Sequence, residues 1–413
     1  MNSQVAEIPN LLQYTKGALR SELPLQKEFV KEAENALSTL DFPTTRHEKW
    51  KYTRLAKIKS LELHASANNQ STTWSDDFTI RIKDGEIQQL PTQNKVEIKL
   101  FSACKEEELA LLGSLSPLKE DIFNAMNFLF QNKGVLIRVG RNQKISDSLR
   151  IEIENTEDKV LSCPRILVVL EEGSSLKMIQ RISGKASASL SIPVAEYFVH
   201  RNAHLVVQKL QAFEGKSYLI QSDYCLQERD SSFTIHSDFV YGNFVRNNLQ
   251  IQVKGENCVT NMYGLFCPQG KQHIDNQTLV DHQISHCVSN ELYKGVVRDE
   301  SSSVFNGKVV VRKDAQQINA FQSNANILLH EKGSINSKPE LEIYANDVKC
   351  SHGCTTGQLD EEAVFYLRAR GLSEESAKNM LVSAFIHDVL EKIEDTRYKE
   401  ILISDLQRYH KFI

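Results

Sequence analysis

The sequence lacks the features that mark several large functional classes. It has no basic excess, with a formal net charge of −4 and a pI near 6.3, whereas a nucleic-acid-binding protein usually presents a basic patch. No apolar run approaches the roughly 20 residues that span a bilayer. The N-terminal stretch 1–24 lacks the basic-then-apolar order of a signal peptide. These absences predict a cytoplasmic protein that binds neither nucleic acid nor a membrane.

Several enzyme motifs are also missing. The phosphate-binding loop G-x-x-x-x-G-K-[ST], the dinucleotide fingerprint G-x-G-x-x-G after a strand and the nucleophile elbow G-x-S-x-G do not occur. A role driven by nucleotide hydrolysis would therefore need an ATPase on another chain. The 8 cysteines include no C-x-x-C pair, so a four-cysteine zinc or cluster site is not predicted. We expect most of them to be small buried hydrophobes rather than a disulfide framework.

The first third of the chain, residues 1–134, has a helical and mixed pattern. Val30, Ala33 and Leu37 recur at helical spacing within 25–43, and a second short helix is expected over 121–132. Alternating residues on either side of Asp84 and Gly85 predict a β-hairpin.

Residues 135–350 read instead as a long series of short strands. They alternate apolar and polar residues, and no convincing helix interrupts them. The polar turns "EEGSS", "HRNAH", "ERDSS" and "GENCV" recur at similar intervals, as in repeat architectures. A β-sandwich remains an alternative, but its two-residue Asn-Gly hairpins are scarce. We favour a parallel β-helix, whose open ends the flanking helical segments would cap.

The C-terminal region, residues 351–413, is helical again. Asp360 and Ser373 are placed to cap two successive helices, and Gly371 separates them. We expect the second helix to bury one apolar stripe, which consists of Ala377, Met380, Leu381, Ala384, Phe385 and Val389.

The motif "CSHGC" carries the clearest chemistry. Cys350 and His352 are two residues apart, so on a strand they point to the same face and could reach a common ion. A soft thiolate beside an imidazole suits iron, zinc or an iron–sulfur species. Two ligands are too few for a closed site, which predicts a transient site completed by another subunit. The competing interpretation is an ordinary strand end. Because Gly353 should break the strand, the direction of Cys354 is not predictable.

A second cluster, "DHQISHC", contains Asp281, His282, His286 and Cys287. On a strand the two histidines would be about 13 Å apart, too far for one metal ion. No glutamate follows His282 as it does in zinc proteases. We therefore expect polar positions on a β face, not a metal site.

Long motifs in the chain resemble the SufB/SufD family, the scaffold subunits of the SUF iron–sulfur cluster assembly system. The resemblance rests on residues 338–372, 289–297 and 303–329, and more weakly on 127–139. The segment "FPTTRHEKWKYT" (42–53) is similar to the SufD branch in particular. In the matching position of "NAFQS", Ser323 stands where SufB has a cluster-building cysteine, and Gly353 replaces a SufB glutamate. Both departures favour SufD.

The resemblance implies a right-handed parallel β-helix flanked by helical regions, pairing with a SufB-like paralogue through the β-helices. A SufC-like ATPase would dock on the C-terminal helices 360–400. His352 and Cys350 would lie near the paralogue interface and contact iron or a nascent cluster shared with that partner. The chain would be a non-catalytic scaffold that binds no cofactor stably by itself, and it could form a homodimer when alone. The alternatives are a purely structural partner without metal contact, or a carbohydrate-active β-helix enzyme.

Overall fold

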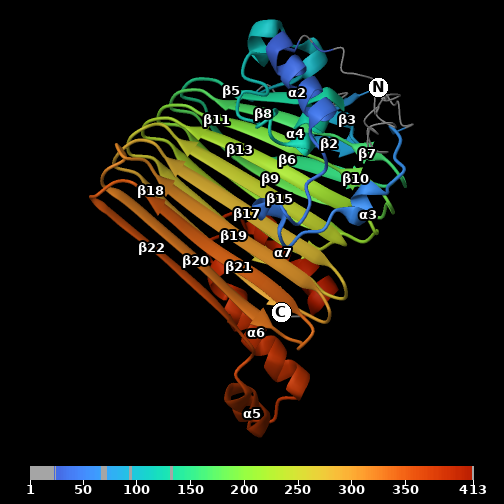
Figure 1. Ribbon diagram of the computed structural model, residues 1–413, viewed down its shortest axis with the longest axis vertical. Helices are drawn as coiled ribbons and strands as arrows, with labels where there is room; N and C mark the ends of the chain where they lie inside the picture. Colours follow the sequence, from blue (N-terminus) through green and yellow to red (C-terminus); the bar gives the residue numbers. More distant parts are fainter. Residues whose placement is uncertain (1–22, 24, 67–71, 93–94, 131–133, 412–413) are drawn as a thin grey trace, which may run out of the picture.

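The computed structural model of the chain describes residues 23, 25–66, 72–92, 95–130 and 134–411 (Figure 1). The N-terminal stretch 1–24, for which no signal-peptide order is expected, lies outside the described residues except for Leu23. Within the described ranges, no helix combines the length and apolar character needed to cross a membrane.

The elements fall into two long sheets and two groups of helices. The helices are α2 (Lys27–Thr39), α3 (Ala56–Lys59), α4 (Ile122–Phe130), α5 (Glu361–Ala369), α6 (Glu374–Leu390) and α7 (Thr396–His410), with 3-10 turns η1 (Glu48–Trp50), η2 (Phe101–Ala103) and η3 (Glu106–Leu109). The first sheet has the spatial order β1 (Thr73–Ser75), β3 (Glu86–Pro91), β2 (Thr79–Lys83), β6 (Lys144–Asn155), β9 (Ser175–Gly184), β12 (His204–Phe213), β14 (Ser232–Tyr241), β16 (Val259–Phe266), β18 (Val288–Val297), β20 (Ile318–Leu328) and β22 (Val348–Gly357). The second has the order β21 (Ser334–Ile343), β19 (Ser302–Val311), β17 (His273–His282), β15 (Phe244–Val253), β13 (Tyr218–Gln227), β11 (Val194–Val199), β8 (Arg165–Leu170), β5 (Val135–Val139) and β4 (Glu97–Leu100), with β10 (Leu190–Ser191) beside β13 and β7 (Leu161–Ser162) beside β10.

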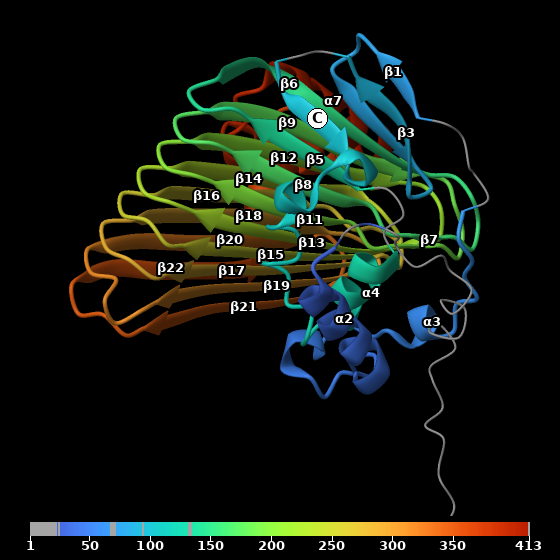
Figure 2. The same ribbon diagram turned by 90° about the horizontal axis from the view of Figure 1, so that it is seen from above.

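From β11 to β22, successive strands alternate between the two sheets, and each pairs in parallel with the strand one coil earlier. The chain therefore forms a parallel β-solenoid of about 8 turns, as expected, and the β-sandwich alternative is wrong. Figure 2 shows the coils stacked one on the next. The Asp84–Gly85 hairpin is also confirmed, because β2 and β3 pair antiparallel around it.

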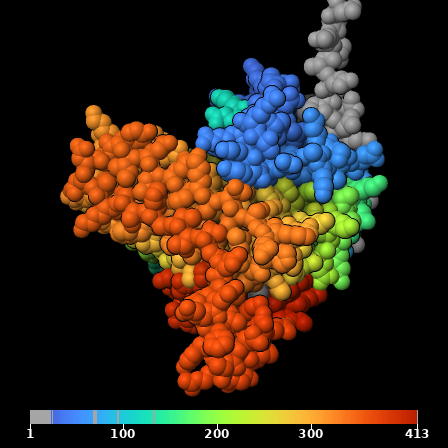
Figure 3. All heavy atoms as spheres, turned by 60° about the horizontal axis from the view of Figure 1, so that its bottom comes forward, coloured from blue at the N-terminus to red at the C-terminus, as the bar shows by residue number. Residues whose placement is uncertain are grey.

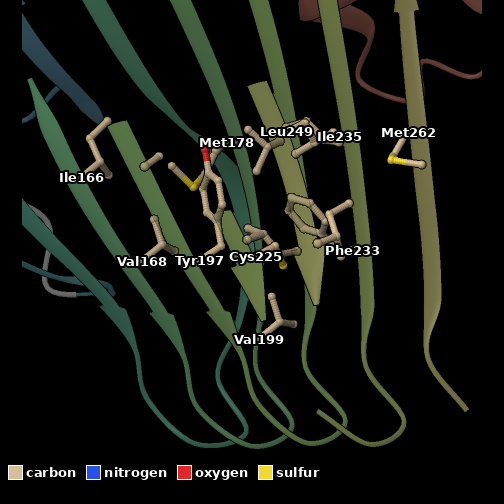
Figure 4. Packing of buried hydrophobic residues seen from close by; sticks show 14 of the residues in the cluster. Ile166, Val168, Met178, Tyr197, Val199, Cys225, Phe233, Ile235, Leu249 and Met262 are labelled. Atoms are coloured by element: carbon tan, nitrogen blue, oxygen red, sulfur yellow. The ribbon is translucent and has the colours of Figure 1, made fainter. Parts of the chain in front are cut away.

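The inward-facing side chains of both sheets form one continuous apolar core along the stack. Figure 4 shows its middle part, where β8 and β11 face β9 and β14 through Ile166, Val168, Tyr197, Val199, Met178, Phe233 and Ile235. Each fully buried side chain of this kind stabilises the fold by about 1.5–3 kcal/mol relative to leaving it exposed. The alternation in the sequence therefore becomes the inside and the outside of the solenoid.

The repeated polar turns are one structural device used several times. Their third residues are Gly173, Asn202, Asp230 and Asn257, and all four have positive φ, between 54° and 70°. Glycine, asparagine and aspartate adopt this left-handed backbone most readily. The amide of Asn202 donates to the Arg229 carbonyl of the next coil at 2.9 Å, and that of Asp230 to Glu256 at 2.8 Å. The turns thus hold neighbouring coils in register.

The helices cover the outer faces of the sheets, not the ends of the stack. The N-terminal helices α2 and α4 pack on outward residues of β5, β8 and β11, and α6 and α7 pack on outward residues of β9 to β18. The expectation that helical segments cap both ends is therefore wrong at the C-terminal end, where β21 and β22 are the last strands of their sheets. The reason is that the strands from β5 to β18 carry apolar residues on their outer faces, and the helices bury these residues. Strand β22 crosses the expected boundary between the β-helix core, which was to end at residue 350, and the C-terminal region, which was to begin at residue 351.

The helical hairpin α5–α6 forms where expected, capped by the side chains of Asp360 and Ser373. The expected stripe of α6 is partly wrong. Ala377 and Val389 are buried, but Met380 and Ala384 are exposed. The contacts with the solenoid come from Val389 of the expected stripe and from Val382, Ile386 and Leu390, which lie outside it.

The N-terminal motif "FPTTRHEKWKYT" lies against the outer face of the second sheet. The Arg246 guanidinium stacks on the Trp50 ring at 3.7 Å, and the Thr53 hydroxyl donates to Asp275 at 2.5 Å. Nearer the last coil, Lys338 of β21 pairs with Glu48 at 2.6 Å. This segment therefore ties the N-terminal helices to the later coils.

Candidate functional site

The candidate site residues lie on β22, the last strand of the first sheet. In the register with β20, Cys350 lies beside Ala320, His352 beside Gln322 and Cys354 beside Asn324. The three β20 residues are buried and face the inside of the solenoid. Because side chains alternate along a strand, these three positions of β22 share the inner face of the terminal coil.

Two of these side chains differ in their exposure. Cys350 is half-buried and packs against the end of the apolar core. Partial burial raises the pKa of the Cys350 thiol, because desolvation disfavours the thiolate. His352 is exposed, because no further coil follows β22. The thiol and the imidazole predicted to share a face therefore do so, at the unpaired edge of the solenoid.

Cys354 joins the same face. The strand does not end at Gly353, which keeps its register with Ser323. The Cys354 thiol donates to the Ser337 hydroxyl of β21 at 3.0 Å, and Ser337 donates to the Asn324 amide oxygen at 2.7 Å. The direction of this thiol could not be predicted from the sequence.

The spacing limits how these donors can be combined. Residues two apart on a strand are separated by about 6.6 Å, and residues four apart by about 13 Å. His352 could therefore share one ion with either cysteine, but not with both. Among the described residues, no three His, Cys, Asp or Glu side chains gather into a group that could hold a metal ion.

A buried polar cluster that the sequence analysis missed lies one coil behind His352. Glu291 of β18 accepts a hydrogen bond from the Thr278 hydroxyl at 2.6 Å and another from the Gln322 side-chain amide at 2.6 Å. Burial raises the pKa of Glu291 to about 7. A Cβ at Gly307 would lie 2.1 Å from the Gln322 amide nitrogen, so a larger residue there would displace this amide. The sequence contained a sign of this cluster, because strand alternation places Gln322 and Asn324 on the same face as the apolar Ile318 and Ala320.

The residues of the second cluster, Asp281, His282, His286 and Cys287, have separate structural roles. His282 is buried at the end of β17, where its Nε2 hydrogen-bonds the Ser289 hydroxyl at 2.9 Å, and burial lowers its pKa to about 4. Asp281 pairs with Arg312 at 2.8 Å, and His286 occupies a turn with positive φ. Six of the eight cysteines are buried free thiols, which confirms the expectation for most of them.

Fold and site together define a parallel β-solenoid protein with an incomplete set of soft donors on its open terminal coil. Residues 152–385 match the family model described as "SUF system FeS cluster assembly, SufBD core domain". The chain belongs to this SufBD family. Within the family it is SufD-like, and Ser323 and Gly353, the two departures from the expected SufB pattern, lie on β20 and β22.

Comparison with individual proteins agrees. The chain is 27% identical over 380 residues to the iron-sulfur cluster assembly protein SufD of Escherichia coli, covering 88% of each chain. It is 26% identical over 389 residues to an iron-sulfur cluster assembly SufBD family protein of Synechocystis, covering 87% of this chain and 86% of the relative. It is also 29% identical over 409 residues to the chloroplastic protein ABCI7 of Arabidopsis thaliana, covering 92% of this chain and 85% of the relative.

Proposed function

We propose that this chain is a SufD-like scaffold subunit on which iron–sulfur clusters are assembled at an interface with a SufB-like paralogue. The observation that carries the proposal is the position of Cys350 and His352 on the inner face of the unpaired terminal strand. Their number is too small for a closed site, and a second chain meeting this end would supply the missing donors. In this role the iron or nascent cluster is cargo, which His352 binds with Cys350 as an accessory ligand.

The open end itself supports pairing with another solenoid. Among the strands that the structure describes, none neighbours the outer row of backbone N–H and C=O groups of β21 or of β22, and such edges bind further strands readily. Ile343 and Tyr344 at the end of β21 are 40% and 58% exposed, which adds apolar surface. In the absence of the paralogue, the same end would accept a second copy of this chain.

The helical hairpin supports docking of a SufC-like ATPase. Phe365 and Tyr366 of α5 and Met380 of α6 are 73%, 57% and 51% exposed, and Figure 3 shows the hairpin projecting from the body of the solenoid. Large apolar side chains exposed together on one short hairpin indicate a binding surface.

The hairpin is also tied firmly to the sheet that carries the site. Lys294 of β18 donates to the Phe385 carbonyl of α6 at 2.5 Å and pairs with Asp388 at 2.5 Å. Strand β18 is followed in the sheet by β20 and then β22. Movement of the hairpin on ATP binding would therefore be passed to the terminal coil through two strand pairings.

The proposal is tested with His352→Ala in the complex reconstituted with the paralogue and the ATPase. We expect the cluster yield after anaerobic loading with iron and sulfide to fall at least tenfold, while complex assembly is unchanged. Ser351→Ala, on the opposite face of the same strand, is the matched control and should load normally. Normal loading of the His352 variant would remove this residue from cluster assembly.

One observation favours a second candidate, a purely structural partner without metal contact. The half-buried Cys350 packs against the core and its thiol pKa is raised, which suits a packing role better than a metal ligand. A complex carrying both Cys350→Ser and His352→Ala distinguishes the two. Full cluster yield with intact assembly would support the structural role.

A further inference from the structure

Gln322 is a buried side chain placed directly beside His352. It lies on the inner face of β20, is 3% exposed, and is in register with His352 on the neighbouring strand. The other neighbour of β20 is β18, which carries Glu291. The Gln322 side chain is therefore flanked by an acid on one side and by the imidazole on the other.

The hydrogen bond to Glu291 determines the orientation of the Gln322 side-chain amide. Above its pKa of about 7, Glu291 is a carboxylate that only accepts hydrogen bonds, and its two oxygens accept from Thr278 and from the Gln322 Nε2, each at 2.6 Å. Glycine at position 307 leaves the space that this arrangement needs, because a Cβ there would lie 2.9 Å from the carboxylate as well as against the amide. The amide nitrogen is thus fixed toward β18.

With its nitrogen held by Glu291, the amide presents its oxygen away from β18. The Gln322 Oε1 is buried and has no hydrogen-bond partner among the described residues. A buried amide oxygen left in this state costs about 1–3 kcal/mol. The strand on its free side is β22, where the imidazole of His352 offers a ring N–H.

We propose that Gln322, oriented by Glu291, is a positioning residue for His352: its Oε1 accepts a hydrogen bond from the protonated ring nitrogen and leaves the other ring nitrogen free to bind a metal ion. Metal-binding histidines usually donate their second ring N–H to an acceptor that fixes the tautomer and the ring orientation. The use of this hydrogen bond rests on the proposed function of His352, and the bond forms when the exposed imidazole turns toward the unpartnered Gln322 Oε1. Glu291 lies in the motif 289–297 and Gln322 in the motif 303–329. The positioning of His352 therefore gives a role to polar residues of both motifs that lie behind the edge strand.

The tautomer of His352 is measured in the metal-free full-length chain labelled with ¹⁵N-histidine. Long-range ¹H–¹⁵N spectra show which ring nitrogen carries the proton, and the His352→Asn spectrum identifies the signal. We expect Gln322→Met, which removes the acceptor but keeps the shape, to change the tautomer ratio at least threefold. Gln221→Met removes a buried amide from a central coil and should leave His352 unchanged.

A second variant covers the case in which Gln322→Met does not fold. Glu291→Gln keeps the size of the side chain but no longer forces the Gln322 nitrogen toward β18, so the tautomer ratio should shift in the same direction. An unchanged ratio in a folded Gln322→Met or Glu291→Gln chain overturns the inference.

The same variants separate this inference from the proposed function. In the assembled complex, Gln322→Met should weaken Fe²⁺ binding 10–100-fold, the usual effect of losing such a supporting partner. A shifted tautomer with normal loading of His352→Ala would contradict the proposed function and leave the positioning intact. Failure of His352→Ala to load, with an unchanged tautomer in Gln322→Met, would do the reverse.

Discussion

Asp238 is a fully buried acid whose hydrogen bonds are best satisfied when it is neutral. The Tyr398 hydroxyl lies 2.9 Å from the Lys209 carbonyl and 2.7 Å from the Asp238 Oδ2, while the Leu265 amide donates to the other carboxyl oxygen. The hydroxyl has one proton. If it donates to the carbonyl, a protonated Asp238 completes the network. Burial accordingly raises the pKa of Asp238 to about 7 from 3.8.

This shift predicts a loss of stability as the pH rises. An acid whose folded pKa is raised contributes its full stability below pH 3.8, and the contribution falls as the pH rises through 7. Asp238→Asn removes the titration, so the variant should gain up to about 4 kcal/mol over the wild type between pH 4 and pH 8. Urea unfolding midpoints at several pH values test this. A difference that does not depend on pH would contradict it.

The contacts that could be predicted from the sequence depend on local strand alternation, whereas those that could not be predicted join residues far apart in the sequence. Cys350 and His352 were predicted to share a face because strand alternation alone decides it. The hydrogen bond between Glu291 and Gln322 was not predicted, because it joins residues 31 apart in sequence that meet only when the coil length is known. A polar residue such as Gln322 at an inward position of a strand was nevertheless a visible sign of a buried polar contact.

The helix α6 shows the limit of periodicity at the level of an element. Its caps and its bounds follow from local chemistry at Ser373 and in the first turn. Its buried face does not, because apolar residues occupy more than one side of the helix. The outward apolar residues of β14, β16 and β18 select the side that contains Val382 and Ile386. Met380 is left exposed on another side.

That exposed side leads to a prediction for the hairpin. Phe365→Ala and Met380→Ser should weaken binding of the ATPase subunit at least tenfold, because apolar side chains at the centre of an interface contribute most of its affinity. The melting temperature should not change, since both side chains are exposed in this chain. Trp74→Ala is the matched control: this ring is 60% exposed on β1, away from the hairpin. Equal binding by all three variants would exclude this surface.

The strand β22 illustrates the opposite case, in which an element extends beyond its local signals. Gly353 weakens a strand by itself, and the sequence therefore predicted a break. The preceding coil overrides this preference, because β20 offers a continuous row of backbone partners from Ile318 to Ile327. Pairing with β20 therefore determined where β22 ends, and it also determined the direction of the Cys354 side chain.

At the scale of the whole molecule, the two ends of the stack are different. The early end is extended by β1–β4, whereas the late end finishes at β21 and β22 without a covering element (Figure 1). Hydrogen exchange should therefore show protection of the amides of Ser334–Ile343 and Val348–Gly357 when the SufB-like paralogue is added. The edge strand β1 (Thr73–Ser75) at the early end is the internal control. Protection at β1 instead of β22 would place the partner at the wrong end for the proposed site.

The stacked architecture also determines which part of the chain can change its conformation most easily. In a solenoid each coil is stabilised mainly by the coils directly before and after it, and the coil bearing Cys350 and His352 has only one such neighbour. Its free energy of local opening should be the lowest along the solenoid. The cluster ligands therefore belong to the part of the chain that rearranges with the least disturbance to the rest, so that a growing inorganic core could be accommodated and released while the remaining coils stay folded.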